Sequence, residues 1–166
     1  MAESEKKKIT PANWVFLGFM AVSLIMIIVA LFTDWLLMTN GSQNESASWS
    51  DIDKMVEMGM PVKGWGATKT FAIFTLILSI VSLGMYIPGM FVKAKVFKVI
   101  GLIASILLII SGVVTFICAF VFVMATYGDI MAAYPSVVYV PHIAAYLMFI
   151  FGIIGGIFGI IGSRKI

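Results

Sequence analysis

Few residues in this chain have side chains that commonly perform chemistry, and those few are scattered. His142 is the one histidine and Cys118 is the one cysteine. A haem held by two histidines, a disulfide within the chain and a cysteine-rich zinc site are therefore excluded. We interpret His142 as a polar residue flanking an apolar segment, or as part of a site completed by another subunit. Cys118, in the middle of an apolar segment, is interpreted as a small buried hydrophobic residue.

Two groups of side chains are candidates for binding or transport. Met55, Met58 and Met60 approach the clustering that a copper site needs, because thioether sulfur is a soft ligand that suits Cu(I). The other group consists of hydroxyls within apolar segments, the one candidate for a polar path: Thr75, Ser79, Ser82 and Thr115. We favour a structural role for both groups and predict neither a cofactor nor a metal ion.

Acidic and basic side chains are absent from the centre of every long apolar segment. Asp34 and Lys69 lie near segment ends, where each can reach water. An ionisable residue deep in such a segment is the usual sign of a proton relay or of ion-coupled transport. The chain also has no glycine-rich phosphate loop and no nucleophile elbow. We therefore predict that the protein is not an enzyme and expect no small-molecule substrate.

Composition determines which elements carry these residues. Of 166 residues, 61% are hydrophobic and only 11% are charged, against about a quarter charged in soluble domains. Four apolar segments each reach the roughly 20 residues that a helix needs to cross the hydrocarbon core. They cover about 14–38, 70–92, 99–125 and 143–162. Because these segments lack the alternation of barrel strands, we predict one domain, 1–166, that is an all-α membrane protein with a four-helix transmembrane bundle.

Basic residues cluster at the ends of these segments, which indicates membrane topology rather than nucleic-acid binding. One group precedes the first span, one fills the turn between the second and third spans, and one follows the fourth: Lys6, Lys7, Lys8, Lys93, Lys95, Lys98, Arg164 and Lys165. Such residues are retained in the cytoplasm. We therefore expect both termini to be cytoplasmic, in a plasma or cell membrane.

The first outer loop, about 39–69, is the main soluble element. Ser50 and Asp53 resemble the capping box that opens a helix. The apolar residues that would share one face of this short amphipathic helix are Ile52, Met55 and Val56. Gly59 and Pro61 are expected to end it. The apolar face would cap the bundle or lie on the membrane surface.

Further candidate sites lie on the outer side. Asn40 and Asn44 each begin an acceptor sequon for N-glycosylation. The second outer loop, about 126–142, is short, and we expect the third span to continue as a helix beyond the bilayer until Pro135 stops it. The aromatic candidates for an outer contact surface are Trp35, Trp49, Trp65 and Tyr134.

Small residues mark where helices approach one another in lipid, since the hydrophobic effect does not drive helices together there. In the third and fourth spans such residues recur on one helix face: Gly101, Ser105, Gly112, Thr115, Gly152, Gly156 and Gly159. We expect these two spans to pack most closely with each other. Alternatively, the glycine face of the fourth span meets another subunit.

Several features of the chain occur together in a known family of four-span proteins. They are Trp35 just outside the first span, a larger first outer loop, the basic inner turn 93–98, the sequence Ser111-Gly112-Val113-Val114 and a glycine-rich fourth span. In these features the chain resembles the claudin and peripheral-myelin-protein-22 group. The resemblance implies lateral assembly and roles in cell contact or barriers. In that family the first outer loop is a small β-sheet held by a Gly-Leu-Trp motif and a cysteine pair. The loop of this chain departs from that pattern, because it lacks both features, is shorter, and is expected to be helical around residues 51–58.

Together these observations predict a non-catalytic four-span protein that acts through lateral protein contacts, as a claudin-like assembly or scaffold. Its partners would be the lipid bilayer and copies of itself. An accessory subunit of a larger membrane complex fits the uncharged spans and the glycine faces equally well. A channel or transporter is the third alternative, with a polar path along the hydroxyls of the second and third spans.

Overall fold

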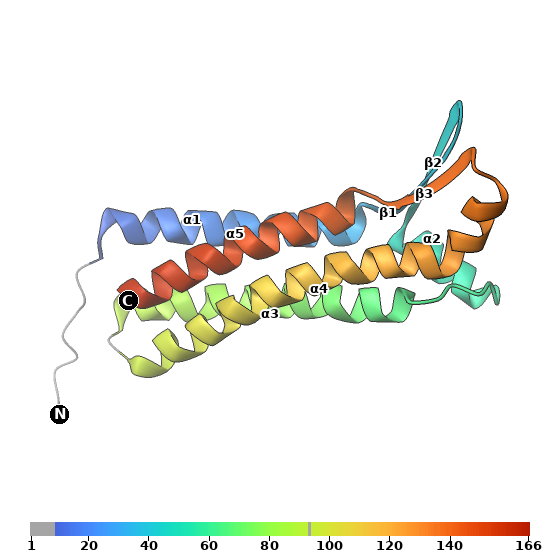
Figure 1. The fold of residues 1–166 in the computed structure, drawn as a ribbon. Coiled ribbons are helices and arrows are strands. Elements are labelled where there is room, and N and C mark those ends of the chain that lie inside the picture. The colour runs from blue at the N-terminus through green and yellow to red at the C-terminus, as the bar shows by residue number, and fades with distance from the viewer. Residues whose placement is uncertain (1–8, 93) are drawn as a thin grey trace.

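The computed structural model describes residues 9–92 and 94–166, which form a helical bundle with a small sheet at one end (Figure 1). Its helices are α1 (Pro11–Phe32), α2 (Trp49–Glu57), α3 (Trp65–Phe91), α4 (Lys95–Ala133) and α5 (Ile143–Lys165). Its strands are β1 (Asp34–Asn40), β2 (Gln43–Ser48) and β3 (Val137–Pro141). The helices α1, α3, α4 and α5 are each long and apolar enough to cross a membrane, which confirms the predicted multi-pass membrane protein in its main feature. Four of the lysines used to predict orientation lie outside the described residues: Lys6, Lys7, Lys8 and Lys93.

The four long helices contact one another in a ring, because α1 and α4 each pack against both α3 and α5. The start of α1, the end of α5 and the turn from α3 to α4 all lie at one end of the bundle (Figure 1). We call this the inner end, and we call the end that carries the sheet the outer end. Large apolar side chains such as Ile25, Ile103 and Val121 are exposed on the outside of the bundle. Such an outer surface is suited to contact with lipid. Serine, threonine and glycine fill much of the inside, as is usual between helices that pack in a membrane.

Hydroxyl groups join α3 to α4 inside the bundle. Thr75 Oγ1 lies 2.8 Å from Ser111 Oγ and 3.2 Å from Thr115 Oγ1. Ser82 Oγ lies 2.7 Å from Ser105 Oγ. The hydroxyls of Ser105 and Thr115 also donate to carbonyl oxygens of their own helix, at 2.6 and 2.8 Å. Polar groups in lipid need partners of this kind, so these hydroxyls stabilise the contact between the two helices.

Glycines let α4 and α5 approach to backbone contact. A Cβ on Gly152 would lie 3.1 Å from the Cα of Gly112, and a Cβ on Gly112 would lie 3.2 Å from the Cα of Gly152. A Cβ on Gly156 would lie 2.7 Å from the carbonyl oxygen of Ser105. Serine side chains occupy the corresponding space at two further positions: Gly101 and Gly159. The small residues of the third and fourth spans therefore meet one another within this chain.

The outer end carries a three-stranded antiparallel sheet in the order β2-β1-β3. Met38 of β1 lies opposite Glu45 of β2 and opposite Tyr139 of β3. A two-residue turn joins β1 to β2, and its first residue, Gly41, has the positive φ of +59° that favours glycine in such turns. The β1–β2 hairpin leaves the bundle near the outer end of α1, and its tip stands clear of the helices to one side (Figure 1).

The prediction of an all-α protein missed this sheet. The first span ends at Phe32, and residues 34–38, assigned to it from their hydropathy, belong to β1. The apolar residues Leu36 to Met38 follow α1 almost without interruption, so composition does not mark the boundary. β2 has the sequence QNESAS, with no β-branched or aromatic residue. Its strand conformation therefore depends on pairing with β1 rather than on intrinsic preference.

The helix α2 confirms the predicted helix of the first outer loop, although it begins earlier than expected. Its capping box is formed by Ser48 and Asp51, so the assignment to Ser50 and Asp53 was wrong. Asp51 N donates to Ser48 Oγ at 3.4 Å, and Ser48 N donates to Asp51 Oδ2 at 3.1 Å. The Ser48 hydroxyl also donates to Asp51 Oδ2 at 2.6 Å, and this bond, with the one from Ser48 N, lowers the pKa of the Asp51 carboxyl. Both Ser48 and Ser50 are followed three residues later by aspartate, so the sequence motif fits either of them. The end of β2 at Ser48 determines which serine caps the helix.

Of the predicted apolar face of α2, Ile52 is fully buried against the bundle and Met55 is half-buried, whereas Val56 is 47% exposed. Only part of that face therefore caps the bundle.

The helix α4 continues beyond the predicted span, as expected from the sequence. It runs through 39 residues and ends at Ala133, just before Pro135. At 1.5 Å per residue its length is about 58 Å, roughly twice the thickness of the hydrocarbon core. The outer part of α4 contacts β3. The protruding helix thus supports the sheet from the side of the second outer loop.

Candidate functional site

Three tryptophans form the centre of the outer end. Trp35 is the second residue of β1, Trp49 begins α2 and Trp65 begins α3. The ring centroids of Trp35 lie 5.7 Å from those of Trp49 and of Trp65, and the latter two are 5.3 Å apart. The rings meet edge to face at 69–75°, the arrangement that brings the positive ring edge to the negative ring face. We call these three residues the tryptophan cluster.

The tryptophan cluster connects the outer elements to the bundle. Trp35 and Trp65 are only 1% and 2% exposed. The buried side chains of Ile52 and Phe122 belong to the same core, and the Phe122 ring lies 5.2 Å from that of Trp65. Burial of large aromatic side chains supplies much of the energy of a core. β1, α2 and α3 are therefore held against α4 at one place.

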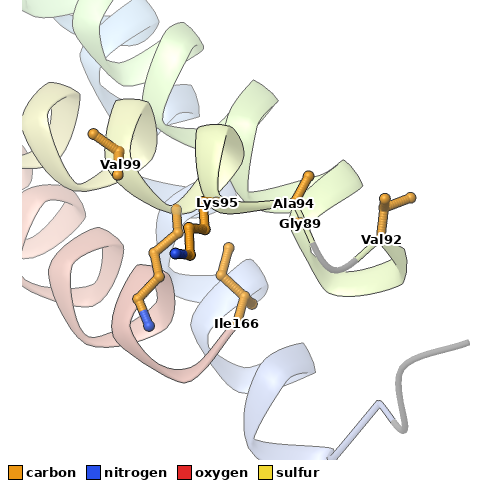
Figure 2. Close-up of a pocket in the computed structure, with 7 residues that line it drawn as sticks. Gly89, Val92, Ala94, Lys95, Val99 and Ile166 are labelled. Carbon is orange, nitrogen blue, oxygen red and sulfur yellow. The ribbon is translucent and has the colours of Figure 1, made fainter. Parts of the chain in front are cut away.

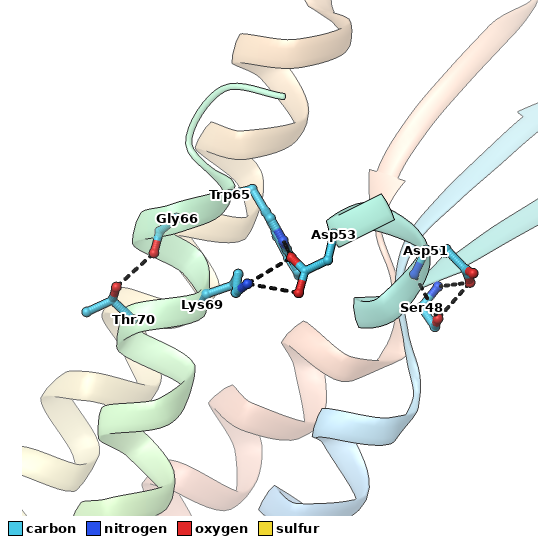
Figure 3. Close-up of polar contacts among 7 residues, drawn as sticks. All are labelled: Ser48, Asp51, Asp53, Trp65, Gly66, Lys69 and Thr70. Carbon is cyan, nitrogen blue, oxygen red and sulfur yellow. Dashed lines mark hydrogen bonds and ion pairs between the residues drawn. The ribbon is translucent and has the colours of Figure 1, made fainter. Parts of the chain in front are cut away.

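Asp53 of α2 adds a polar contact beside the tryptophan cluster (Figure 3). Trp65 Nε1 donates to Asp53 Oδ1 at 2.8 Å, and Lys69 Nζ donates to both carboxylate oxygens of Asp53 at 2.8 Å. The Lys69 ammonium also lies 5.4 Å from the centre of the Trp49 ring. Burial raises the pKa of Asp53, but the hydrogen bonds from Lys69 and Trp65 outweigh it, so the pKa is lowered overall.

We predict that Asp53→Asn destabilises the protein near neutral pH but not in acid. The carboxyl group titrates near pH 3.9 in an unfolded chain and at a lower pH in the folded protein. Its stabilising effect is therefore present above about pH 4 and is lost as the pH falls through the folded-state pKa. Loss of the charged partner is expected to cost about 1–2 kcal/mol at pH 7.

Thermal unfolding in a mild detergent, measured at pH 7 and below the folded-state pKa, tests this prediction. Asp129→Asn removes an exposed carboxylate from the outer part of α4 and is the matched control. If the two variants lose the same stability at pH 7, or if the Asp53 effect persists in acid, the prediction is wrong.

Two stacked tyrosines fasten the second outer loop. The rings of Tyr127 in α4 and Tyr139 in β3 are 4.1 Å apart and nearly parallel, at 8°. The Tyr127 hydroxyl donates to Met55 Sδ of α2 at 3.9 Å. The backbone N–H of His142 donates to the carbonyl oxygen of Trp35 at 2.9 Å. The two outer loops are thus joined to each other as well as to the bundle.

The turn of the β1–β2 hairpin and the residues next to it are exposed. Asn40 and Asn44, which begin the two sequons, are both exposed next to its turn. β1 pairs with strands on both sides, whereas β2 has a neighbouring strand on one side only within the part of the chain that the structure describes. The outward edge of β2 therefore presents backbone donors and acceptors that no strand of this sheet satisfies.

The aromatic residues predicted as outer contacts fall into two groups. Trp35, Trp49 and Trp65 come together in the tryptophan cluster, whereas Tyr134, at the end of α4, is 64% exposed and is not part of it. Sequence reasoning assigned Asp53 to a helix cap and missed its contact with the cluster. No local signal marks this contact, because the partners of Asp53 lie 12 and 16 residues away in the chain.

The three methionines considered for copper binding, Met55, Met58 and Met60, do not form one cluster. Met55 and Met60 line a cavity of about 230 Å³ together with Met38, while Met58 is largely exposed. Within residues 9–92 and 94–166 no group of three or more histidine, cysteine, aspartate or glutamate residues could hold a metal ion. Cys118 is half-buried in α4.

Comparisons of the chain with protein-family models, with curated proteins and with solved structures find no match. A hairpin with a free strand edge projects from the bundle and is fastened to it by the tryptophan cluster, and this is the candidate functional site.

Proposed function

We propose that this protein is a non-catalytic membrane tetraspan that assembles with copies of itself through lateral contacts, as a claudin-like protein or scaffold. The observation that carries the proposal is the β1–β2 hairpin. Its tip stands clear of the bundle to one side, and the outward edge of β2 has no neighbouring strand among the described residues (Figure 1). A free strand edge is a template for pairing with another chain.

An identical strand suits this edge. A twofold axis can bring the same strand of two copies together in antiparallel orientation, so that donors of each meet acceptors of the other. β2 carries one charged residue, Glu45, and its other side chains are neutral. It has neither the lysines nor the prolines that often block an exposed edge. Attachment of the hairpin to the tryptophan cluster also limits the entropy that assembly would cost.

Two features support the claudin-like part of the proposal. The first outer loop contributes two strands to a small sheet, as the first loop does in that family, although the sequence predicted a departure from the family here. The tryptophan cluster holds this loop to the bundle without the cysteine pair of the family. We further propose that the inner end, with Lys98, Arg164 and Lys165, is cytoplasmic, because basic residues near spans are retained there. The membrane would then be a plasma or cell membrane.

An accessory subunit of a larger complex is the second candidate. It is favoured by Ile130 and Tyr134, which are exposed on the part of α4 that extends past the predicted span. Apolar surface outside lipid often binds a protein partner. Transport has less support, because the hydroxyls Thr75, Ser111 and Thr115 bind one another and thereby serve helix packing.

Extraction in a gentle detergent, followed by native mass measurement, distinguishes these functions. A uniform homo-oligomer is expected if the protein assembles with itself. An unrelated protein present in fixed stoichiometry would instead identify an accessory subunit and overturn the proposal. Ion flux through the purified protein in liposomes would instead support the channel or transporter alternative.

A pair of proline variants tests the strand edge directly. In an antiparallel pair, successive residues point their N–H groups alternately toward and away from the partner strand. Of Asn44→Pro and Glu45→Pro, one therefore removes a bond to β1 and the other removes only a donor of the free edge. Both substitutions abolish the Asn44 sequon, so they are matched in any effect on glycosylation.

We expect the edge-facing variant to keep the thermal stability of the parent protein and to run as a monomer in native mass measurement. The inward-facing variant is expected to lose stability at the outer end. An edge-facing variant that stays oligomeric would show that another surface mediates assembly.

A further inference from the structure

A pocket of about 430 Å³ lies at the inner end, between the last turn of α3, the first turn of α4 and the end of α5 (Figure 2). Its wall is mostly apolar and includes Val92, Val99 and Ile166. Two basic side chains complete the lining, Lys95 and Lys98. A cavity of this volume is in the range of small-molecule and lipid-headgroup sites.

The positive charge around this pocket has no side-chain carboxylate partner in the described part of the chain. All acidic residues of that part lie at the outer end or in its loops: Asp34, Glu45, Asp51, Asp53, Glu57 and Asp129. The two ion pairs among the described residues, Lys54 with Asp51 and Lys69 with Asp53, are also there. Lys98 Nζ donates to the carbonyl oxygen of Arg164 at 3.2 Å, which neutralises no charge. The pocket therefore favours an anion.

The position of the pocket restricts the kind of anion. Lys95 is the first residue of α4, whereas Val99 lies one turn further along the apolar helix. Lysines at the end of an apolar helix place their ammonium groups at the level of lipid headgroups. The pocket thus combines two cations with an apolar wall at the level of the headgroups. A free phosphate ion would use only the cations.

We propose that this pocket binds an anionic glycerophospholipid, with the phosphate between Lys95 and Lys98 and the first acyl carbons against Val99 and Ile166. Basic pockets between transmembrane helices recognise lipid headgroups through this combination of charge and apolar contact. The proposal holds whichever leaflet the inner end occupies, and it does not depend on assembly through the hairpin.

Binding of phosphatidylglycerol to the purified, delipidated protein in detergent, counted by native mass spectrometry, tests the proposal. Phosphatidylcholine with the same acyl chains is the uncharged comparison. We expect the parent protein to bind phosphatidylglycerol more tightly than phosphatidylcholine. The double variant Lys95→Gln/Lys98→Gln is expected to lose about 25-fold in affinity for phosphatidylglycerol, from about fivefold for each lysine near a membrane surface.

Lys54→Gln/Lys63→Gln is the matched control, since it removes two charges from the outer end and should leave binding unchanged. Ala94→Phe keeps both lysines but fills the pocket, and it should also weaken binding. Inorganic phosphate in excess should not displace the lipid. Equal binding of the two lipids, equal losses in both double variants, unchanged binding in Ala94→Phe, or displacement by phosphate would each overturn the proposal.

Discussion

Replacing Gly156 by alanine should destabilise the bundle by about 3 kcal/mol, an amount at the upper end of ordinary overpacking effects. The added Cβ would lie 2.7 Å from the carbonyl oxygen of Ser105 and would also collide with the side chain of Ile109. A carbonyl oxygen in the middle of α4 moves only if the helix moves. The strain therefore spreads to the neighbouring close contact between Gly112 and Gly152.

Unfolding in mixed detergent, followed by loss of helical circular dichroism, measures this effect. Gly84→Ala is the matched control, because a Cβ at this glycine in α3 meets nothing within 4 Å. That substitution should be neutral or slightly stabilising, since alanine is the better helix former. In the double variant Ile109→Ala/Gly156→Ala only part of the loss should be recovered. Full recovery would contradict the prediction, because it would mean that the side chain rather than the backbone limits the approach.

The four long helices were predictable from the sequence, because the constraint that lipid places on a spanning segment acts within that segment alone. A spanning segment must satisfy its backbone hydrogen bonds internally, so hydropathy and length alone identify a helix. Local signals also marked two further features. Pro135 predicted where α4 stops, and the motif residues near Asp51 predicted a helix there.

The sheet depends on contacts between distant parts of the chain, so the sequence did not predict it. β1 pairs with β3, about 100 residues further along, and this pairing cannot be inferred from either segment alone. The tryptophans illustrate the same limit at the candidate site. Their position in or next to the first outer loop suggested a contact surface, yet Trp35 and Trp65 are buried in contact with each other. Single-sequence reasoning finds such side chains but not the partners that determine their role.

Trp35→Ala should release the outer sheet from the bundle at a cost of about 4 kcal/mol, as for other large aromatic side chains deleted from a core. Trp35 is 1% exposed and packs against both other members of the tryptophan cluster. Hydrogen exchange measured by mass spectrometry should show faster exchange throughout the β1–β2 hairpin and α2. The spanning part of α4 should stay protected, because its contacts with α3 and α5 lie elsewhere.

Two further variants separate packing from other causes. Trp14→Ala removes an exposed tryptophan at the inner end and should leave the hairpin unaffected. Trp35 Nε1 is buried without a hydrogen-bond partner among the described residues, so Trp35→Phe sacrifices ring area but no hydrogen bond. We therefore expect Trp35→Phe to retain most of the hairpin protection. If Trp35→Ala leaves the hairpin protected from hydrogen exchange, or if it unfolds all four long helices together, the prediction is wrong. The tryptophan cluster would then not be the contact that attaches the hairpin to the bundle.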